Sequence, residues 1–431
     1  MRSSPVASLH GVVVALLVWT LGPTTIVGST TTERRQATLV VTSGLAGRLV
    51  DGEHTIADLT ATIRRVVAER RATGHDVLVL DTGVTLAPYA ESRPDAGAAM
   101  LRALRDAGCE VFMPHPVDLV VGSHAFTASS PSATPTVLRA FGTDAPPLAT
   151  RDTVARVELA EVPIAMRAFD HPDFIRDLAA AGVEATAIDP TTALDGHRAD
   201  DPIQIAILHS RGQGLLDHDM AWSLIDEPRG YDLLLDPDLE ADLVVRREVP
   251  SAGHAVFLVG RALSTERPWT FAVVDLELVR DPDHGWSIDR VRQTVHGLDP
   301  EATPDPQLEA SVRAAYANFE HRYGRPLPDA APDDREGLAA YVLGALREAT
   351  RAEIAILDHG ALRPVAEEHL TPPLTREAVV RLLSLDQGVV VGELTGRQLR
   401  ELAADSVRRP LDRAYSTALR FAGLSFDSAR D

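Results

Sequence analysis

Short, continuous apolar runs alternate with segments of helical periodicity over about residues 36–265. The runs at residues 77–80, 205–208 and 233–235 lack a regular polar alternation, which is typical of strands that are covered on both faces. Between such runs, apolar residues recur every three to four positions, as on one face of an amphipathic helix. Strands that alternate with helices in this way predict an α/β domain.

The first part of this region has a definite order of elements. We predict strands at residues 38–42, 77–81 and 117–121, helices at residues 56–71 and 97–107, and turns at residues 43–47 and 82–85. Residues 127–147 are rich in Ser, Thr, Pro and Ala, and this composition predicts a loop.

A second β-rich part follows. We predict strands at residues 255–259, 270–278 and 286–293, with a turn at residues 281–285 between the last two. Residues 300–306 then mark a domain boundary, because helical spacing resumes at residues 308–323. We therefore predict one domain over residues 36–300, a linker helix within residues 301–326 and a second domain over residues 327–431.

The second domain mixes helices and strands. We predict helices at residues 336–350, 376–383 and 397–406, strands at residues 353–357 and 388–394, and a turn at residues 358–363. Thr395 is a suitable N-cap for the last helix. Residues 419–426 predict a further strand, shortly before the sequence ends.

Composition excludes several classes of function. The chain has 431 residues and a formal net charge of −20, which disfavours binding to nucleic acid or to anionic lipid surfaces. Cys109 is the single cysteine, so disulfides within the chain and multi-cysteine metal sites are excluded. We interpret Cys109 as a buried, unreactive thiol.

The N-terminus predicts export. Arg2 precedes an apolar run at residues 9–27, and small residues follow at 28–30. We interpret residues 1–30 as a secretory signal peptide, with an uncleaved N-terminal anchor as the alternative. We therefore expect a periplasmic or extracellular protein, which contacts a membrane only if this segment is retained.

The predicted turns carry recognisable motifs. They read Ser43-Gly44-Leu45-Ala46-Gly47, Asp81-Thr82-Gly83-Val84 and Gly122-Ser123-His124-Ala125-Phe126, and the second domain adds Asp358–Arg363 and Glu393-Leu394-Thr395-Gly396-Arg397-Gln398-Leu399. In this order, the motifs resemble those of the 5'-nucleotidase family of dinuclear metallophosphoesterases. The resemblance implies an α/β/β/α sandwich of the metallophosphoesterase type, followed by a smaller α+β C-terminal domain that is shortened here.

The resemblance also implies a dinuclear metal site, yet its ligand positions are altered. The family places metal ligands at the positions of Gly44, Ala46, Val84 and Ser123, of which the first three have no donor atom in the side chain. His209 matches a metal-binding histidine of the family. Two neighbouring divalent ions need several anionic or imidazole ligands and a bridging carboxylate. The resemblance therefore supports the fold more strongly than the chemistry.

Three further residues have a role only through the resemblance. His124 falls on the histidine that stabilises the transferring phosphoryl group, and Asp238 and Glu240 fall on a later pair of metal-binding histidines. His209, Asp238 and Glu240 are thus candidates for a rebuilt metal site; the alternative is a solvated acidic loop at residues 236–240. His115 lies between Pro114 and Pro116, matches no family position and is interpreted as a loop residue.

The substrate site is altered as well. Gly360 and Arg363 remain from the family's nucleotide-binding turn, and Arg363 is a candidate contact for an anion; a surface arginine is the alternative. Leu385 stands where the family has an aromatic residue that stacks on the base, and an aliphatic side chain cannot stack in that way.

Two functional hypotheses follow. The first is an exported, non-catalytic binding or scaffold protein without a cofactor, whose partner is a small anionic ligand or a protein. The second is a metal-dependent phosphoester hydrolase of nucleotide catabolism, or a thiosulfohydrolase-like enzyme, as Phe126-Thr127 suggests. Metal content separates them, because such an enzyme carries two divalent ions per chain and a decayed one carries none.

Overall fold

The structure is a computed structural model of the chain. It describes residues 32–86, 91–116, 118–119, 135–138, 141–142, 153–171, 186–188, 202–209, 224, 230–237, 243–249, 254–260, 269–282, 285–327, 335–358, 374–382, 389–407 and 419–424. The predicted signal peptide or anchor at residues 1–30 lies outside this part of the chain. Among the helices described, none is long and apolar enough to span a membrane.

The first of two six-stranded sheets has the order β16-β15-β1-β4-β5-β6. Its strands are β1 (Glu33–Thr42), β4 (Asp76–Asp81), β5 (Cys109–Phe112), β6 (Thr136–Val137), β15 (Phe271–Asp281) and β16 (Gly285–His296). β1, β4, β5 and β6 run parallel, whereas β15 and β16 add an antiparallel ribbon beside β1. The parallel strands therefore end at one edge of the sheet.

The second sheet has the order β13-β14-β12-β11-β9-β8. Its strands are β8 (Val154–Leu159), β9 (Val162–Asp170), β11 (Ile203–His209), β12 (Leu233–Asp236), β13 (Leu243–Val249) and β14 (His254–Gly260). The four central strands are parallel, and β8 and β13 are antiparallel edge strands. The described residues also form two small ribbons, β2 (Val50–Asp51) with β3 (His54–Thr55), and β7 (Phe141–Gly142) with β10 (Thr186–Ala187).

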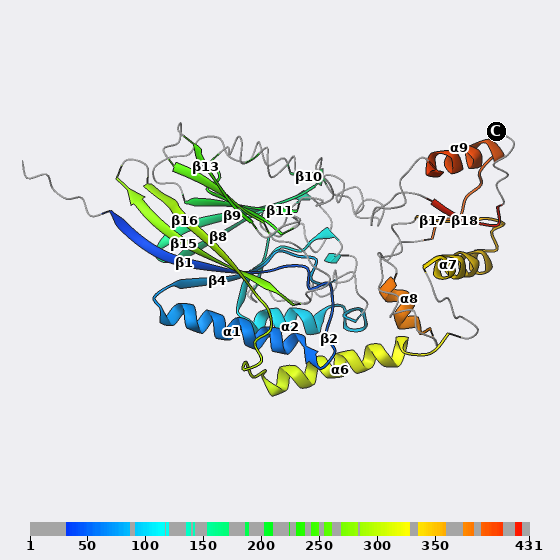
Figure 1. Cartoon of the computed structure of the whole chain (residues 1–431), viewed down its shortest axis with the longest axis horizontal. Coiled ribbons are helices and arrows are strands. Elements are labelled where there is room, and N and C mark those ends of the chain that lie inside the picture. Colours follow the sequence, from blue (N-terminus) through cyan, green and yellow to red (C-terminus); the bar gives the residue numbers. More distant parts are fainter. Residues whose placement is uncertain are drawn as a thin grey trace, which may run out of the picture.

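The two sheets face each other, and helices cover the outer face of the first. α1 (Ile56–Ala72), α2 (Ala98–Asp106) and α6 (Pro306–Tyr323) contact one another on that face, and the second sheet lies on the opposite side (Figure 1). Alternate residues of β11 confirm the layering: Ile205 and Ile207 belong to the main core, whereas Ala206 and Leu208 pack with Leu224 on the other face. The predicted sandwich is confirmed.

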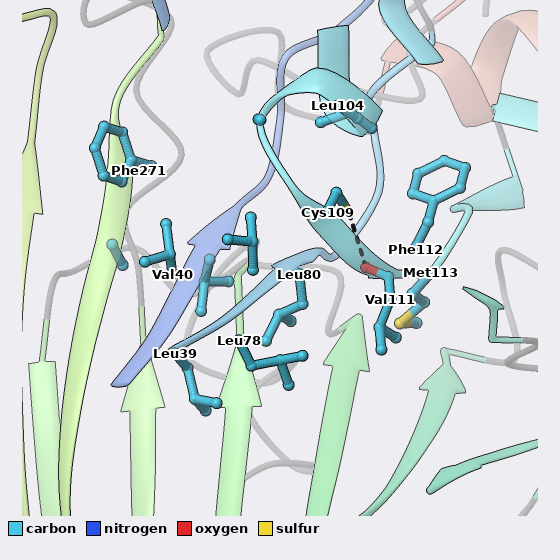
Figure 2. Packing of buried hydrophobic residues seen from close by; sticks show 14 of the residues in the cluster. Leu39, Val40, Leu78, Leu80, Leu104, Cys109, Val111, Phe112, Met113 and Phe271 are labelled. Carbon is cyan, nitrogen blue, oxygen red and sulfur yellow. Dashed lines mark hydrogen bonds between the residues drawn. The ribbon is translucent and has the colours of Figure 1, made fainter. Parts of the chain in front are cut away.

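The core of the first sheet is made from the apolar runs seen in the sequence. Figure 2 shows Leu39, Leu78 and Val111 on neighbouring strands, together with Cys109. Cys109 is buried, its thiol contacts the carbonyl oxygen of Val111 at 3.2 Å, and burial raises the thiol pKa well above its usual range. The prediction of an unreactive thiol is therefore supported, because the thiolate is the reactive form.

Local signals explain the first helix. Thr55 and Asp58 form a capping box, in which each side chain accepts a hydrogen bond from the other residue's backbone. Helix α1 then buries Leu59 and Ile63 against the sheet and ends before Gly74, which adopts φ +87°. A left-handed glycine is a common end to a helix.

One predicted strand is wrong in the N-terminal part. Residues 117–121 were expected to be extended, yet Pro116, Asp118 and Leu119 are helical and the strand is β5, closer to α2. Proline favours the first turn of a helix, and the Asp118 carboxylate accepts the backbone N–H of His115 at 2.9 Å. These local features favour the helical conformation of residues 116, 118 and 119. The expected loop at 127–147 also contains the short strands β6 and β7.

The C-terminal elements lie beyond α6, at the right of Figure 1. They are α7 (Arg335–Thr350), β17 (Ala355–Asp358), α8 (Arg376–Leu382), α9 (Gly396–Val407) and β18 (Leu419–Ala422). β17 and β18 form an antiparallel pair. Thr395 caps α9 as predicted, since its hydroxyl accepts the backbone N–H of Gln398 at 3.3 Å.

The strand predicted at residues 388–394 is wrong. Residues 389–395 are irregular, and Val389, Val390 and Val391 are 61%, 92% and 66% exposed. A continuous apolar run is typical of a strand covered on both faces. Within the described C-terminal residues, the only sheet is the pair of β17 and β18, and neither strand pairs with this run.

Candidate functional site

Polar residues end four strands where the two sheets meet. Thr42 and Asp81 are the last residues of β1 and β4 in the first sheet, and Asp170 and His209 are the last residues of β9 and β11 in the second. All four are buried, with at most 2% of their surface exposed. Because parallel strands bring their carboxyl ends to one edge, this edge is the position at which ligands bind in α/β folds.

The first two turns of the chain are joined directly by their backbones. The N–H groups of Gly44 and Ala46 donate to the carbonyl oxygens of Gly83 and Val84, at 3.0 and 2.7 Å. Ala46 and Val84 both adopt the left-handed region, with φ of 59° and 53°. That region is costly for residues with a Cβ and most costly for β-branched ones. The turns thus keep a demanding conformation although their side chains carry no donor atom.

We expect Ala46→Gly to raise the free energy of unfolding by about 1 kcal/mol, because glycine adopts positive φ without a steric cost. Ala68→Gly is the matched control: Ala68 is exposed in the middle of α1, where the same change should cost about 1 kcal/mol. Urea denaturation of both variants measures the two effects. Destabilisation by both substitutions would contradict the strain assigned to Ala46.

Asp81 holds the second turn together. Its Oδ1 accepts hydrogen bonds from the Thr85 hydroxyl at 2.6 Å and from the Gly83 N–H at 3.0 Å, and its Oδ2 accepts from the Thr42 hydroxyl at 2.6 Å. Burial raises the pKa of Asp81 to about 6, although these hydrogen bonds favour the charged form. Both carboxylate oxygens of Asp81 are therefore used by the protein itself.

A third turn, after β5, places His115 next to the second turn, at the edge where the two sheets meet. Gly83 permits this approach, since a Cβ there would lie 2.6 Å from the carbonyl oxygen of Met113 and 2.7 Å from the nitrogen of His115. Asp118 fixes the turn by accepting N–H groups of His115, Thr85 and Leu86 at 2.7 to 2.9 Å. Burial raises the pKa of Asp118 to about 7.

His209 links the second sheet to the first. Its Nε2 lies against the carbonyl oxygen of Thr82, and its Nδ1 lies 2.7 Å from Oδ1 of Asp170. A carbonyl oxygen only accepts, so Nε2 carries a proton. A second proton must then lie between Nδ1 and Asp170, on the ring or on the carboxyl group. Burial raises the pKa of Asp170, against the effect of His209.

His115, Asp170 and His209 form a compact group, which we call the His–Asp–His centre. Their ligand atoms all lie within 4.8 Å of one another, and the two imidazole rings have centroids 4.8 Å apart. Burial, and secondarily His209, lowers the pKa of His115 well below its usual range, so its imidazole is neutral at pH 7. Two imidazoles and a carboxylate are suitable ligands for a transition metal.

The residues do not fit the dinuclear centre that the sequence motifs imply. Gly44, Ala46 and Val84 supply no ligand, and the first two turns bond to each other through their backbones. Both oxygens of Asp81 accept hydrogen bonds from donors of the protein itself. A bridged pair of ions needs a carboxylate between the metals. Val84 stands at that position of the motif, and its side chain has no carboxylate.

The structure places only part of the predicted site. It brings Gly44, Ala46, Val84 and His209 together at one edge, as expected. The other predicted residues, His124, Asp238, Glu240, Gly360 and Arg363, lie outside the described part of the chain, as does Ser123.

Sequence reasoning missed two residues of the His–Asp–His centre. His115 was interpreted as a loop residue; it is 4% exposed and its ring lies beside His209. Its signal was the short run that ends at Phe112, which is the strand that leads into its turn. Asp170 ends an apolar run in the same way as Asp81, and this pattern could have identified it.

The fold is that of 5'-nucleotidases and related phosphoesterases. Solved structures with it include the sulfate thiohydrolase SoxB of Thermus thermophilus, with a TM-score of 0.52 and 16% identity over 74% of this chain and 68% of that one. A 5'-nucleotidase precursor, also from Thermus thermophilus, gives 0.53 and 14% over 76% and 70%. The NAD nucleotidase of Haemophilus influenzae gives 0.50 and 11% over 76% and 74%. No family model and no curated protein sequence matches the chain.

Proposed function

We propose that this chain is an exported, non-catalytic protein with a 5'-nucleotidase fold, which acts by binding rather than by hydrolysis. The observation that carries the proposal is the direct bonding of the first turn to the second, through Gly44 and Ala46. Proteins that share the fold are named as nucleotidases or as a sulfate thiohydrolase. The fold is thus compatible with hydrolysis, and it is the residues at the site that support the absence of hydrolysis.

The reaction of a two-metal phosphoesterase makes specific demands. The ions lower the pKa of a bound water, and they neutralise charge on the attacking and leaving oxygens. Both tasks need two ions a few ångströms apart, held by fixed anionic ligands. Here Val84 stands at the bridging position of the motif, and the hydroxyls of Thr42 and Thr85 donate to the two oxygens of Asp81. The side chain of Val84 has no atom that could bridge two ions.

We further propose that the ligand is a small anion or a protein partner. Arg363, with Gly360 in the same predicted turn, is the proposed contact for an anion, because a guanidinium binds carboxylates and phosphates with two parallel hydrogen bonds. Export is proposed from the apolar run at residues 9–27.

The test is a hydrolysis assay on the purified chain, with nucleoside monophosphates and a thiosulfonate ester, in added Mn²⁺, Co²⁺ or Zn²⁺. We expect no turnover above the blank, because loss of the bridging ligand prevents the pair of ions from binding. Without the ions, no water is activated and the charge on the attacking and leaving oxygens is not neutralised. A 5'-nucleotidase with intact motifs, assayed in parallel, is the positive control.

Turnover that disappears in His209→Ala would overturn the proposal. It would favour the alternative, a metal-dependent hydrolase whose site is rebuilt from His209, Asp238 and Glu240. Turnover that is equal in wild type and in His209→Ala would be assigned to a contaminating enzyme, and repetition after further purification should abolish it.

A further inference from the structure

The His–Asp–His centre joins the two sheets through side chains of different strand ends. His115 comes from the turn after β5 of the first sheet, while Asp170 and His209 end β9 and β11 of the second. All three are at most 4% exposed. We infer that this centre binds one transition-metal ion, in place of the dinuclear pair that the motifs imply, and that the ion fastens the sheets together.

An unsatisfied atom points to a ligand at this place. Oδ2 of Asp170 is buried and has no hydrogen-bond partner among the described residues, whereas Oδ1 accepts from or donates to Nδ1 of His209. A buried carboxylate oxygen without a partner is costly, and such atoms are generally satisfied by a donor, a water or an ion. A cation at the His–Asp–His centre would satisfy it directly.

Both histidines can coordinate an ion at this centre, His209 through Nδ1 once the ion replaces the proton between Nδ1 and Asp170. The ring of His115 lies beside that of His209, with centroids 4.8 Å apart, and a neutral imidazole offers one nitrogen lone pair to a metal. His209 donates from Nε2 to the carbonyl oxygen of Thr82, which orients the ring so that Nδ1 faces Asp170. A backbone carbonyl bound to the far nitrogen is one of the ways in which proteins orient a metal-binding imidazole.

The ligand set selects the class of ion. Ca²⁺ and Mg²⁺ prefer sites made of oxygen atoms, whereas two imidazole nitrogens and one carboxylate oxygen suit Zn²⁺ and its neighbours. Three protein ligands leave one position of a tetrahedral zinc ion for a water. The inference concerns only the binding of the ion, so it goes beyond the proposed absence of hydrolysis and does not depend on it.

The test is metal analysis of the whole chain after equilibration with Zn²⁺ and removal of excess metal. We expect about one zinc per wild-type chain and a rise in Tm of about 4–5 °C at a free zinc concentration 100 times the Kd. No bound zinc would overturn this inference and leave the proposed function intact. Two ions per chain, with turnover, would overturn both.

Variants locate the ion. His115→Ala and Asp170→Asn should each lose the bound zinc, whereas Asp232→Asn, which alters another buried carboxyl of the second sheet, should keep it. Retention of one zinc by both His115→Ala and Asp170→Asn would overturn the assignment to this centre. Circular dichroism of each variant shows whether it is folded.

A measurement on the wild type keeps the inference testable if the variants do not fold. X-ray absorption at the zinc edge should show nitrogen and oxygen ligands with imidazole scattering, and no second metal at about 3.5–4 Å. A metal neighbour at that distance, or the absence of imidazole scattering, would overturn the single-ion centre.

Discussion

Gly83→Ala is expected to lower the free energy of unfolding by about 3 kcal/mol or more. The new Cβ would lie 2.6 Å from the carbonyl oxygen of Met113 and 2.7 Å from the backbone nitrogen of His115. Both are backbone atoms, so relief requires the third turn to move as a whole. The left-handed conformation, at φ +95°, costs alanine about 1–2 kcal/mol, and the overpacking adds about 1–3 kcal/mol.

Gly74→Ala is the matched control for this substitution. Gly74 also has a positive φ, of +87°, yet a Cβ there meets nothing within 4 Å. The control should therefore cost only the conformational part, about 1 kcal/mol. Urea denaturation, with the midpoint and slope compared for both variants, measures the difference. Equal losses would show that the second and third turns are not in close contact, and the place of His115 in the site would then be wrong.

The fold could be predicted from the sequence because its signals are local and redundant. The capping box at Thr55, the apolar runs that became β4, β11 and β12, and the helical face of α6 each identify an element without reference to the others. The order of these elements then restricts the topology, since parallel strands need crossover helices. The two-layered arrangement of sheets followed from that order and from the resemblance.

The candidate site could be predicted only in part, because its members are defined by contacts between the sheets. His209 was identified by its motif, but the partner of its Nδ1 is Asp170, 39 positions earlier and on a neighbouring strand. His115 was misassigned because the valines after Pro116 resemble a strand, and the expected turn was therefore placed too late in the chain. Sequence periodicity identifies single helices and strands, but it does not show which strand ends lie next to one another in the fold.

The failed strand at residues 388–394 has a related cause. An apolar run predicts a strand only if neighbouring strands are present to accept its backbone hydrogen bonds. The described C-terminal residues supply one pair, β17 and β18, and Val390 remains 92% exposed. The residue pattern alone could not reveal this, because the pattern describes the run and not its surroundings.

The free energy of unfolding should fall as the pH rises from about 4 to about 8, because the buried carboxyl group of Asp232 loses its proton over this range. Its carboxyl group is completely buried, and its Oδ2 accepts the backbone N–H of Gln204 at 2.8 Å. Burial raises its pKa from 3.8 to about 7, because the charged form is poorly solvated, and the hydrogen bond from Gln204 offsets only part of this effect. The folded state therefore binds the proton more tightly than the unfolded state.

The direction of the stability change and its pH range follow from the pKa of Asp232 in the unfolded state, 3.8, and in the folded state, about 7. Below about pH 4 both states are protonated, and the contribution of the bound proton to stability is fully present. As the pH rises through the folded pKa of about 7, this contribution is lost, and the total is on the order of 4 kcal/mol. The buried carboxyls of Asp81 and Asp118 act in the same direction, since burial raises both pKa values.

Asp232→Asn isolates the effect of this one group. The amide keeps an oxygen that can accept the N–H of Gln204, and it does not titrate. At pH 4, where both side chains are neutral, the variant and the wild type should have similar free energies of unfolding, which controls for shape. At pH 8 the variant should be the more stable, by on the order of 4 kcal/mol, because it no longer holds a charge in the core. Urea denaturation at each pH unit from 4 to 8 gives the two curves, and parallel curves would show that Asp232 is not protonated in the folded protein.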